Sequence, residues 1–113
     1  MDEKEYAMES YEKEILAVIE DIKTLFLEKN NSYNNENDPM LNFTIGGIVR
    51  NKPHSYPGKY EAMKDYVMKH VAKVFSHNIY AKNIDESLKD IAVYMIIGIV
   101  MKRRFDKDIK NPF

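Results

Sequence analysis

The chain has no cysteine, so neither a disulfide framework nor thiolate chemistry is available to it. This absence fits a reducing compartment, and we expect a cytoplasmic protein. A membrane-spanning run is also missing, because the apolar stretch at residues 91–101 has 11 residues and a bilayer span needs roughly 20. The first residues, MDEKEYAMES, are acidic, whereas a signal peptide begins with basic residues and continues with apolar ones. We therefore expect no secretion signal and no membrane partner.

The chain also lacks an excess of charge of either sign. Its 17 Lys and Arg residues nearly balance its 18 Asp and Glu residues. Without a net positive field, attraction to nucleic acid by bulk charge is not expected. A chain of 113 residues is long enough to form one hydrophobic core without disulfides or metals. We expect a single helical domain spanning residues 1–113.

What the sequence does contain is helical periodicity. Two long segments, residues 10–29 and 59–76, place apolar side chains at steps of three and four, which is typical of amphipathic helices. In the first segment these are Tyr11, Ile15, Val18, Ile19, Ile22, Leu25 and Phe26; in the second they are Tyr60, Met63, Val67, Val71, Val74 and Phe75. Whether residues before 10 extend the first helix stays open.

A third helix is predicted over residues 84–105, IDESLKDIAVYMIIGIVMKRRF. Asp85 suits its N-cap, and the basic residues 102–104 suit its C-terminus. Between them, residues 91–101 are apolar on every side except at Gly98. A helix that is apolar all round must be buried, in the centre of a bundle or between subunits. We therefore expect a buried central helix and a homo-oligomer, with a dimer favoured.

The chain between the first two helices is predicted to be a long loop. Residues 30–38 are rich in Asn, which favours turns, and Asp38-Pro39 favours an extended conformation. Residues 44–59 carry the helix breakers Gly46, Gly47, Pro53, Pro57 and Gly58. The fold class is accordingly all-α, a compact bundle of about three long helices with a long loop between the first and second.

Two carboxylates attract attention on the third helix. Glu86 and Asp90 lie four residues apart and therefore share one helix face, and Tyr94 continues the same line. Such a pair can form a metal or acid/base site. It can equally be an acid-enriched first turn that interacts with the helix dipole. Both readings stay open at this point.

Cationic and aromatic residues offer contacts for a nucleotide. Lys69 and Lys73 lie one turn apart, and His70, Lys73 and His77 share a side of the second helix, where they could neutralise a polyphosphate. Tyr33 and Phe43 bracket the Asn-rich segment. This pair could stack on a base, or it could simply anchor the loop to the core.

Three ordered motifs carry a resemblance to a known family. They are KNNSY at residues 29–33, DPMLNF at 38–43 and ESLKDIAVY at 86–94. In order and rough spacing they resemble the phage proteins that carry the first of the nucleotide modification associated domains. That family is similar in turn to the all-α nucleoside triphosphate pyrophosphatases of the MazG-like group. The resemblance covers about residues 20–105. Where the family has an acid-Lys-x-x-Arg motif, this chain has KHVAK at 69–73, and Ser32 replaces an acid of the first motif.

The resemblance implies a phage protein of the host cytoplasm that binds a nucleotide phosphate. It implies Glu86 and Asp90 as catalytic residues and as ligands of Mg²⁺. The ligand-binding residues that it implies are Lys29, Asn30, Tyr33, Asn42, Phe43, Lys69, His70, Lys73 and Tyr94. Mg²⁺-dependent hydrolysis of a nucleoside triphosphate is one reading. Binding without turnover, as in a sponge, an anti-defence protein or a regulator, is the alternative, and a purely structural or partner-inhibiting protein is a third.

Overall fold

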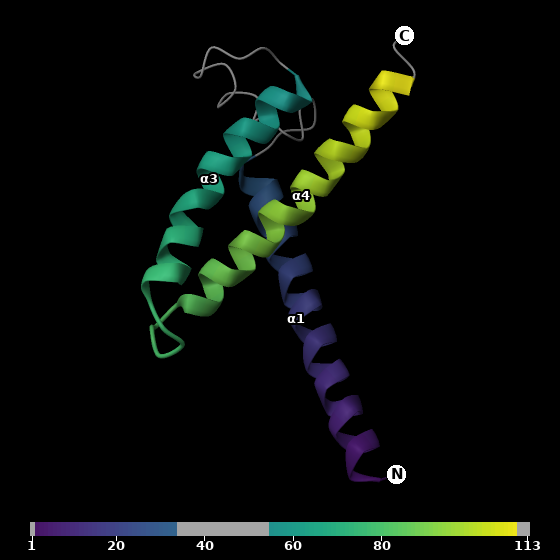
Figure 1. The fold of residues 1–113 in the computed structure, drawn as a ribbon, viewed down its shortest axis with the longest axis vertical. Helices are drawn as coiled ribbons and strands as arrows, with labels where there is room; N and C mark the ends of the chain where they lie inside the picture. Colours follow the sequence, from purple (N-terminus) through teal and green to yellow (C-terminus); the bar gives the residue numbers. More distant parts are fainter. Residues whose placement is uncertain (1, 34–54, 111–113) are drawn as a thin grey trace. The chain divides into compact units, whose positions relative to one another are not determined.

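The computed structural model describes residues 2–33 and 55–110, with side chains described over 2–29 and 55–108. Every regular element in these ranges is an α-helix: α1 Glu3–Tyr33, α3 Tyr56–Ser76 and α4 Ile84–Lys110 (Figure 1). The all-α prediction is therefore confirmed. The predicted loop residues 34–54 lie outside the described part. The chain divides into two compact units, Met1–Ser32 and Tyr33–Phe113. The single domain expected from the sequence stays a prediction.

Helix α1 is longer at both ends than its periodicity indicates. Asp2 begins it, because its Oδ1 accepts a hydrogen bond of 2.8 Å from the Glu5 backbone N–H. At the other end the helix continues through residues 30–33, which we predicted to be loop. Asn costs less than about 1 kcal/mol relative to Ala in a helix interior, and an established helix propagates one bond at a time. Two consecutive Asn residues therefore do not terminate it.

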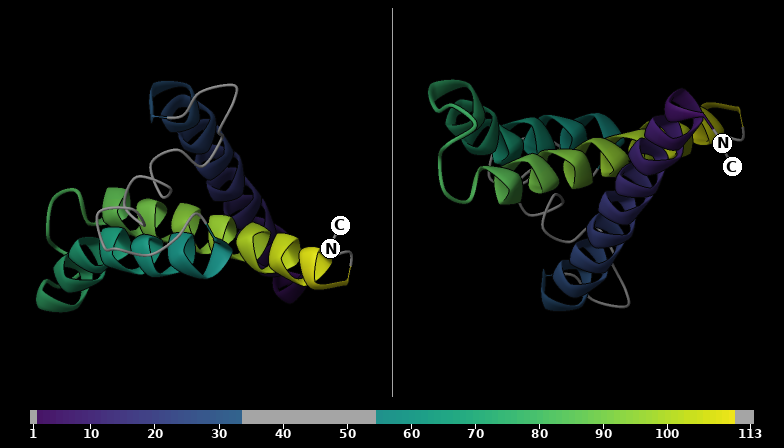
Figure 2. Two further views of the ribbon diagram at one scale, coloured as in Figure 1. Left: turned by 90° about the horizontal axis from the view of Figure 1, so that it is seen from above. Right: turned by 90° about the horizontal axis from the view of Figure 1, so that it is seen from below.

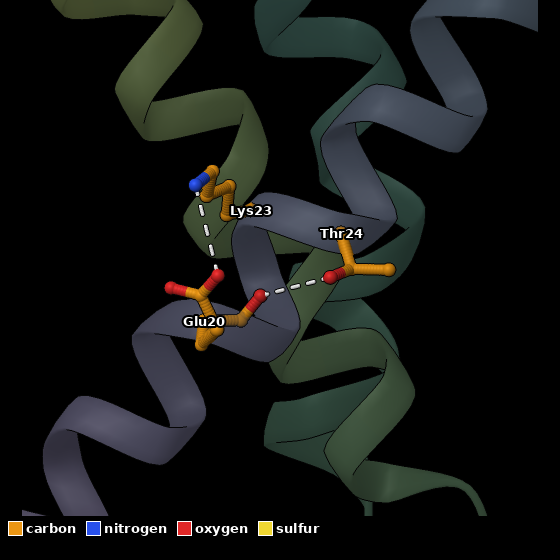
Figure 3. A network of polar contacts seen from close by, with 3 residues as sticks. All are labelled: Glu20, Lys23 and Thr24. Atoms are coloured by element: carbon orange, nitrogen blue, oxygen red, sulfur yellow. Dashed lines mark hydrogen bonds and ion pairs between the residues drawn. The ribbon is translucent and has the colours of Figure 1, made fainter.

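Polar contacts on α1 link successive turns of the helix (Figure 3). Lys23 Nζ lies 3.6 Å from Glu20 Oε1, and the Thr24 hydroxyl donates a hydrogen bond of 3.2 Å to the Glu20 carbonyl. All of these groups are exposed to solvent. The ion pair stabilises the helix by a few tenths of a kcal/mol, whereas a hydroxyl bonded to the carbonyl four residues earlier gives it no net support. Neither contact defines a site.

Helix α3 begins where the sequence was expected to break helices. Ser55 is its N-cap, with an extended backbone and a side chain that accepts a hydrogen bond of 3.2 Å from Gly58 N–H. Pro57 lies in the first turn, where a missing N–H removes no helical hydrogen bond. Pro57 and Gly58 therefore start the helix, and the breaker assignment for these two residues was wrong.

Helix α4 follows a short connection at residues 77–83. Asn83 precedes the helix with φ 66°, and its backbone carbonyl accepts a hydrogen bond from Ser87 N–H. Asp85 is consequently in the first turn rather than at the N-cap. The helix also runs past the predicted end at 105 to Lys110. There Lys102 Nζ lies 2.6 Å from Asp106 Oδ1, an i,i+4 pair that supports the extra turn.

Helices α3 and α4 pack side by side as an antiparallel hairpin (Figures 1 and 2). The buried centre of the interface is formed by Met63, Val67 and Met101. The half-buried residues around it are Tyr56, Tyr66, Val71, Ile91, Tyr94 and Ile97. Most of the predicted stripe of the second helix thus faces α4, whereas Phe75 at its end is exposed.

The expected burial of residues 91–101 on all sides is not observed. Val93 and Met101 are buried, but Ile96 and Ile99 are about half exposed, at 51% and 52%. A single partner helix covers only one side of α4, and the hairpin supplies one partner. None of the described helices is long and apolar enough to cross a membrane.

Candidate functional site

The site residues that the structure brings together lie across the α3–α4 hairpin. His70 of α3 places its Nδ1 3.7 Å from Oδ2 of Asp90 on α4. Both side chains are largely buried, with 17% and 14% of their surface exposed. A carboxylate at this distance attracts a protonated imidazole, and partial burial strengthens the attraction. Asp90 is therefore part of a helix-to-helix contact and not a solvated surface acid.

Tyr94 completes this cluster from the next turn of α4. Its ring centroid lies 6.1 Å from that of His70, with the ring planes inclined by 34°. Residues 90 and 94 are one turn apart, so both face the same length of α3. His70, Asp90 and Tyr94, which we define as the hairpin cluster, thus come from two separate motifs of the sequence.

The lysines of α3 lie beside the hairpin cluster. Lys73 is half-buried and follows His70 by three residues, so it shares that face of the helix. Lys69 is exposed. Helix α3 ends a few residues after Lys73. There the Lys73 carbonyl lies 2.9 Å from His77 Nδ1 and accepts a hydrogen bond from the Ser76 hydroxyl. The cluster therefore has a neighbouring ammonium group on its own face.

Glu86 lies one turn before Asp90 and is exposed, in the first turn of α4. Among residues 2–33 and 55–110, no three His, Asp or Glu side chains gather closely enough to hold a metal ion. Two carboxylates alone can hold Mg²⁺ only when water molecules and ligand phosphates complete an octahedron. Asp90 also faces His70, so a cation there would have to share or displace the imidazole.

The other predicted ligand residues belong to the first compact unit or have side chains outside the described residues. Lys29 is half-buried on α1. Asn30 and Tyr33 belong to the last turn of α1, but their side chains lie outside the described residues. Asn42 and Phe43 also lie outside the described residues. The stacking pair of Tyr33 and Phe43 accordingly stays a prediction.

Sequence reasoning missed a groove at the far end of the hairpin. Its volume is about 710 Å³, within the range of small-ligand pockets. It is lined by Tyr56, Pro57, Tyr60, Met63, Met95, Gly98, Ile99, Met101, Lys102, Arg103 and Phe105. The aromatic pair at 56 and 60 was the available signal, since an i,i+4 spacing places both rings on one face.

Comparison with protein-family models, with curated proteins and with solved structures finds no match. The family resemblance and the activity that it implies therefore remain predictions, and the geometry of the hairpin is the observation from which a function is argued.

Proposed function

We propose that the chain binds a nucleotide through its phosphate groups at the hairpin cluster and the adjoining Lys73. The observation that supports this proposal is the meeting of His70 with Asp90 and Tyr94 across two helices. His70, one of the predicted phosphate ligands on α3, thus contacts Asp90 of the carboxylate pair on α4. Partly buried charged groups on neighbouring elements are common at functional sites.

Each side chain has a distinct role in this proposal. Lys73 donates charge-assisted hydrogen bonds to phosphate oxygens, and protonated His70 adds a second donor. Asp90 orients the His70 ring through the 3.7 Å contact between Nδ1 and Oδ2. Tyr94 offers a ring face and a hydroxyl next to the imidazole. Lys69, exposed on the adjacent turn, adds positive charge at longer range.

We propose Mg²⁺-dependent hydrolysis of the bound nucleotide as the second candidate activity. A Mg²⁺ ion held by Glu86 and Asp90 would polarise a bound phosphate and activate water. Binding is the primary proposal because Asp90 already faces an imidazole, whereas Glu86 is exposed. In either case we propose a cytoplasmic homodimer, in the host cytoplasm for a phage-encoded chain. The half-exposed apolar side of α4 supports the dimer.

Calorimetry with a panel of nucleoside triphosphates, with and without Mg²⁺, tests the proposal. We expect Lys73→Ala to weaken binding about tenfold or more in both conditions, since its contact is with the anion itself. Lys64→Ala is the matched control, because Lys64 is a cation on the same helix that pairs with Glu61 at 2.9 Å. Equal affinities for wild type and the Lys73 variant would contradict the proposed phosphate site.

An assay of phosphate and pyrophosphate release separates binding from turnover. If Mg²⁺ sits on Asp90, Asp90→Asn removes the Mg²⁺-dependent part of binding and any hydrolysis while metal-independent binding persists. Stability is measured in parallel, because Asp90 also contacts α3. Unchanged ligand binding in a variant that melts at a lower temperature would show that the His70–Asp90 contact is purely structural.

A further inference from the structure

Helix α4 carries an apolar stripe outside the buried α3–α4 cluster, and Met95 and Ile99 of this stripe also line the groove next to α3. Its side chains recur at steps of three and four residues, and most are about half exposed. The stripe consists of Leu88, Ala92, Met95, Ile96, Ile99 and Val100. Met101, which belongs to the buried α3–α4 cluster, is 1% exposed, and Val93, three residues before Ile96, is also buried at the edge of the stripe. Exposed apolar surface in a continuous line is typical of a docking face.

Opposite charges close the two ends of this stripe. Asp85 precedes it with a side chain that is 72% exposed, and Arg103 follows it and is also exposed. The 18 residues that separate them correspond to five turns of 3.6 residues, so both project from the same line of the helix. The stripe thus has a carboxylate at one end, which also pairs with Lys89 of its own helix, apolar side chains between the ends, and a guanidinium group at the other end.

A surface of this kind is complementary to itself when reversed. In an antiparallel pair with its two-fold axis at the level of residue 94, Asp85 of each copy meets Arg103 of the other. The same pairing sets Leu88 against Val100 and Ala92 against Ile96. A parallel pair would instead bring like charges together at both ends, which is destabilising. An isologous two-fold interface requires this self-complementarity.

We propose that a second copy of this chain docks on the α4 stripe, with the two α4 helices antiparallel. The two α3–α4 hairpins then form a four-helix arrangement with the α4 pair at its centre. The inference specifies the proposed dimer and does not depend on nucleotide binding. The proposed dimer would also fill the groove with residues of the partner. Met95 and Ile99 of the stripe, and Arg103 at its end, line the groove as well. The start of the partner's α4 lies along that side.

Sedimentation of the full chain over a concentration series measures the dissociation constant. We expect Asp85→Arg and Arg103→Asp each to weaken the dimer about tenfold, because two attractive pairs become repulsive by symmetry. The double variant, which carries both substitutions, restores the affinity, since the exchanged side chains again meet as opposite charges. Asp85 also pairs with Lys89 at 3.9 Å, but Asp85→Arg removes that pair with or without the second substitution. A restored dimer affinity in the double variant therefore reports on the contact between residue 85 of one copy and residue 103 of the other.

A second experiment replaces an apolar residue of the stripe. Ile96→Glu places a carboxylate near the axis, and the hairpin stays folded because Ile96 is about half exposed. We expect this variant to be monomeric at concentrations where wild type is dimeric. Met68→Glu is the control, since Met68 is an exposed apolar residue on α3 outside the stripe. A wild-type monomer would overturn both the dimer and its interface. A dimer insensitive to Ile96→Glu and to the charge reversals would overturn this interface alone.

Discussion

Met63 of α3 packs directly against Gly98 of α4. A Cβ added to Gly98 would lie 3.2 Å from Met63 Cε and 3.7 Å from Tyr60 Cε2. Met63 is almost completely buried, at 1% exposure. The approach of the two helices at this level therefore depends on the absence of a side chain at position 98, and it helps to set which residues of α3 face which residues of α4.

Replacing Gly98 by a residue larger than alanine should destabilise the hairpin. We expect Gly98→Val to lower the free energy of unfolding by about 1–3 kcal/mol through overpacking. Gly98→Ala should stay within about 1 kcal/mol of wild type, because the gain in helix propensity offsets a small shift of the Met63 side chain. Urea unfolding measures both. A valine variant as stable as wild type would show that the helices separate freely at this point.

The contact between His70 and Asp90 should contribute measurably to stability. Considered as a surface acid, Asp90 would tolerate Asn at a cost under about 0.5 kcal/mol. Its side chain is only 14% exposed and faces His70, so we expect Asp90→Asn to cost about 1 kcal/mol. A double-mutant cycle with His70→Gln isolates the coupling energy between the two side chains. Asp108→Asn, at an exposed acid of the same helix outside the α4 stripe, is the control. Additive effects in the cycle would rule out a direct interaction.

The contribution of the α3 N-cap to stability can be tested by removing the hydroxyl oxygen of Ser55. Ser55 Oγ accepts a hydrogen bond from Gly58 N–H, and Ser55→Ala should cost about 1 kcal/mol of unfolding free energy. Ser76→Ala serves as the comparison, because the Ser76 hydroxyl is exposed and donates to a carbonyl at the other end of the helix. We expect thermal melting to show a clear shift for the first variant and little for the second.

Asn83 holds the one positive φ among the described residues other than glycine. Asn tolerates the left-handed region better than residues with unbranched apolar side chains, and Gly tolerates it best. We expect Asn83→Ala to destabilise the hairpin by about 1 kcal/mol and Asn83→Gly to be neutral or slightly stabilising. Chemical unfolding of the two variants measures the order. If alanine proved the more stable, the turn would adopt a different backbone in solution.

The sequence was sufficient to predict the helices because their signal is local. Apolar residues at steps of three and four identify a helix whatever it packs against, and all three predicted helices are present. Helix ends were less well predicted. Pro57 and Gly58 are breakers in most contexts, but Ser55 converts them into a capped first turn. The position of a helix end depends on which of several competing hydrogen bonds forms. The local amino-acid composition alone does not determine which one does.

The residues of the candidate site were named from the sequence as parts of one ligand site, but the direct contact between His70 and Asp90 was not predicted. His70 and Asp90 were selected on separate helices, and only the packing of α3 on α4 places one against the other. Likewise, the apolar run at 91–101 indicates that α4 needs partners without indicating on which side. The tertiary structure decided both points, because the register between two helices and the choice of buried face follow from close packing, such as that of the Met63 side chain against the backbone at Gly98.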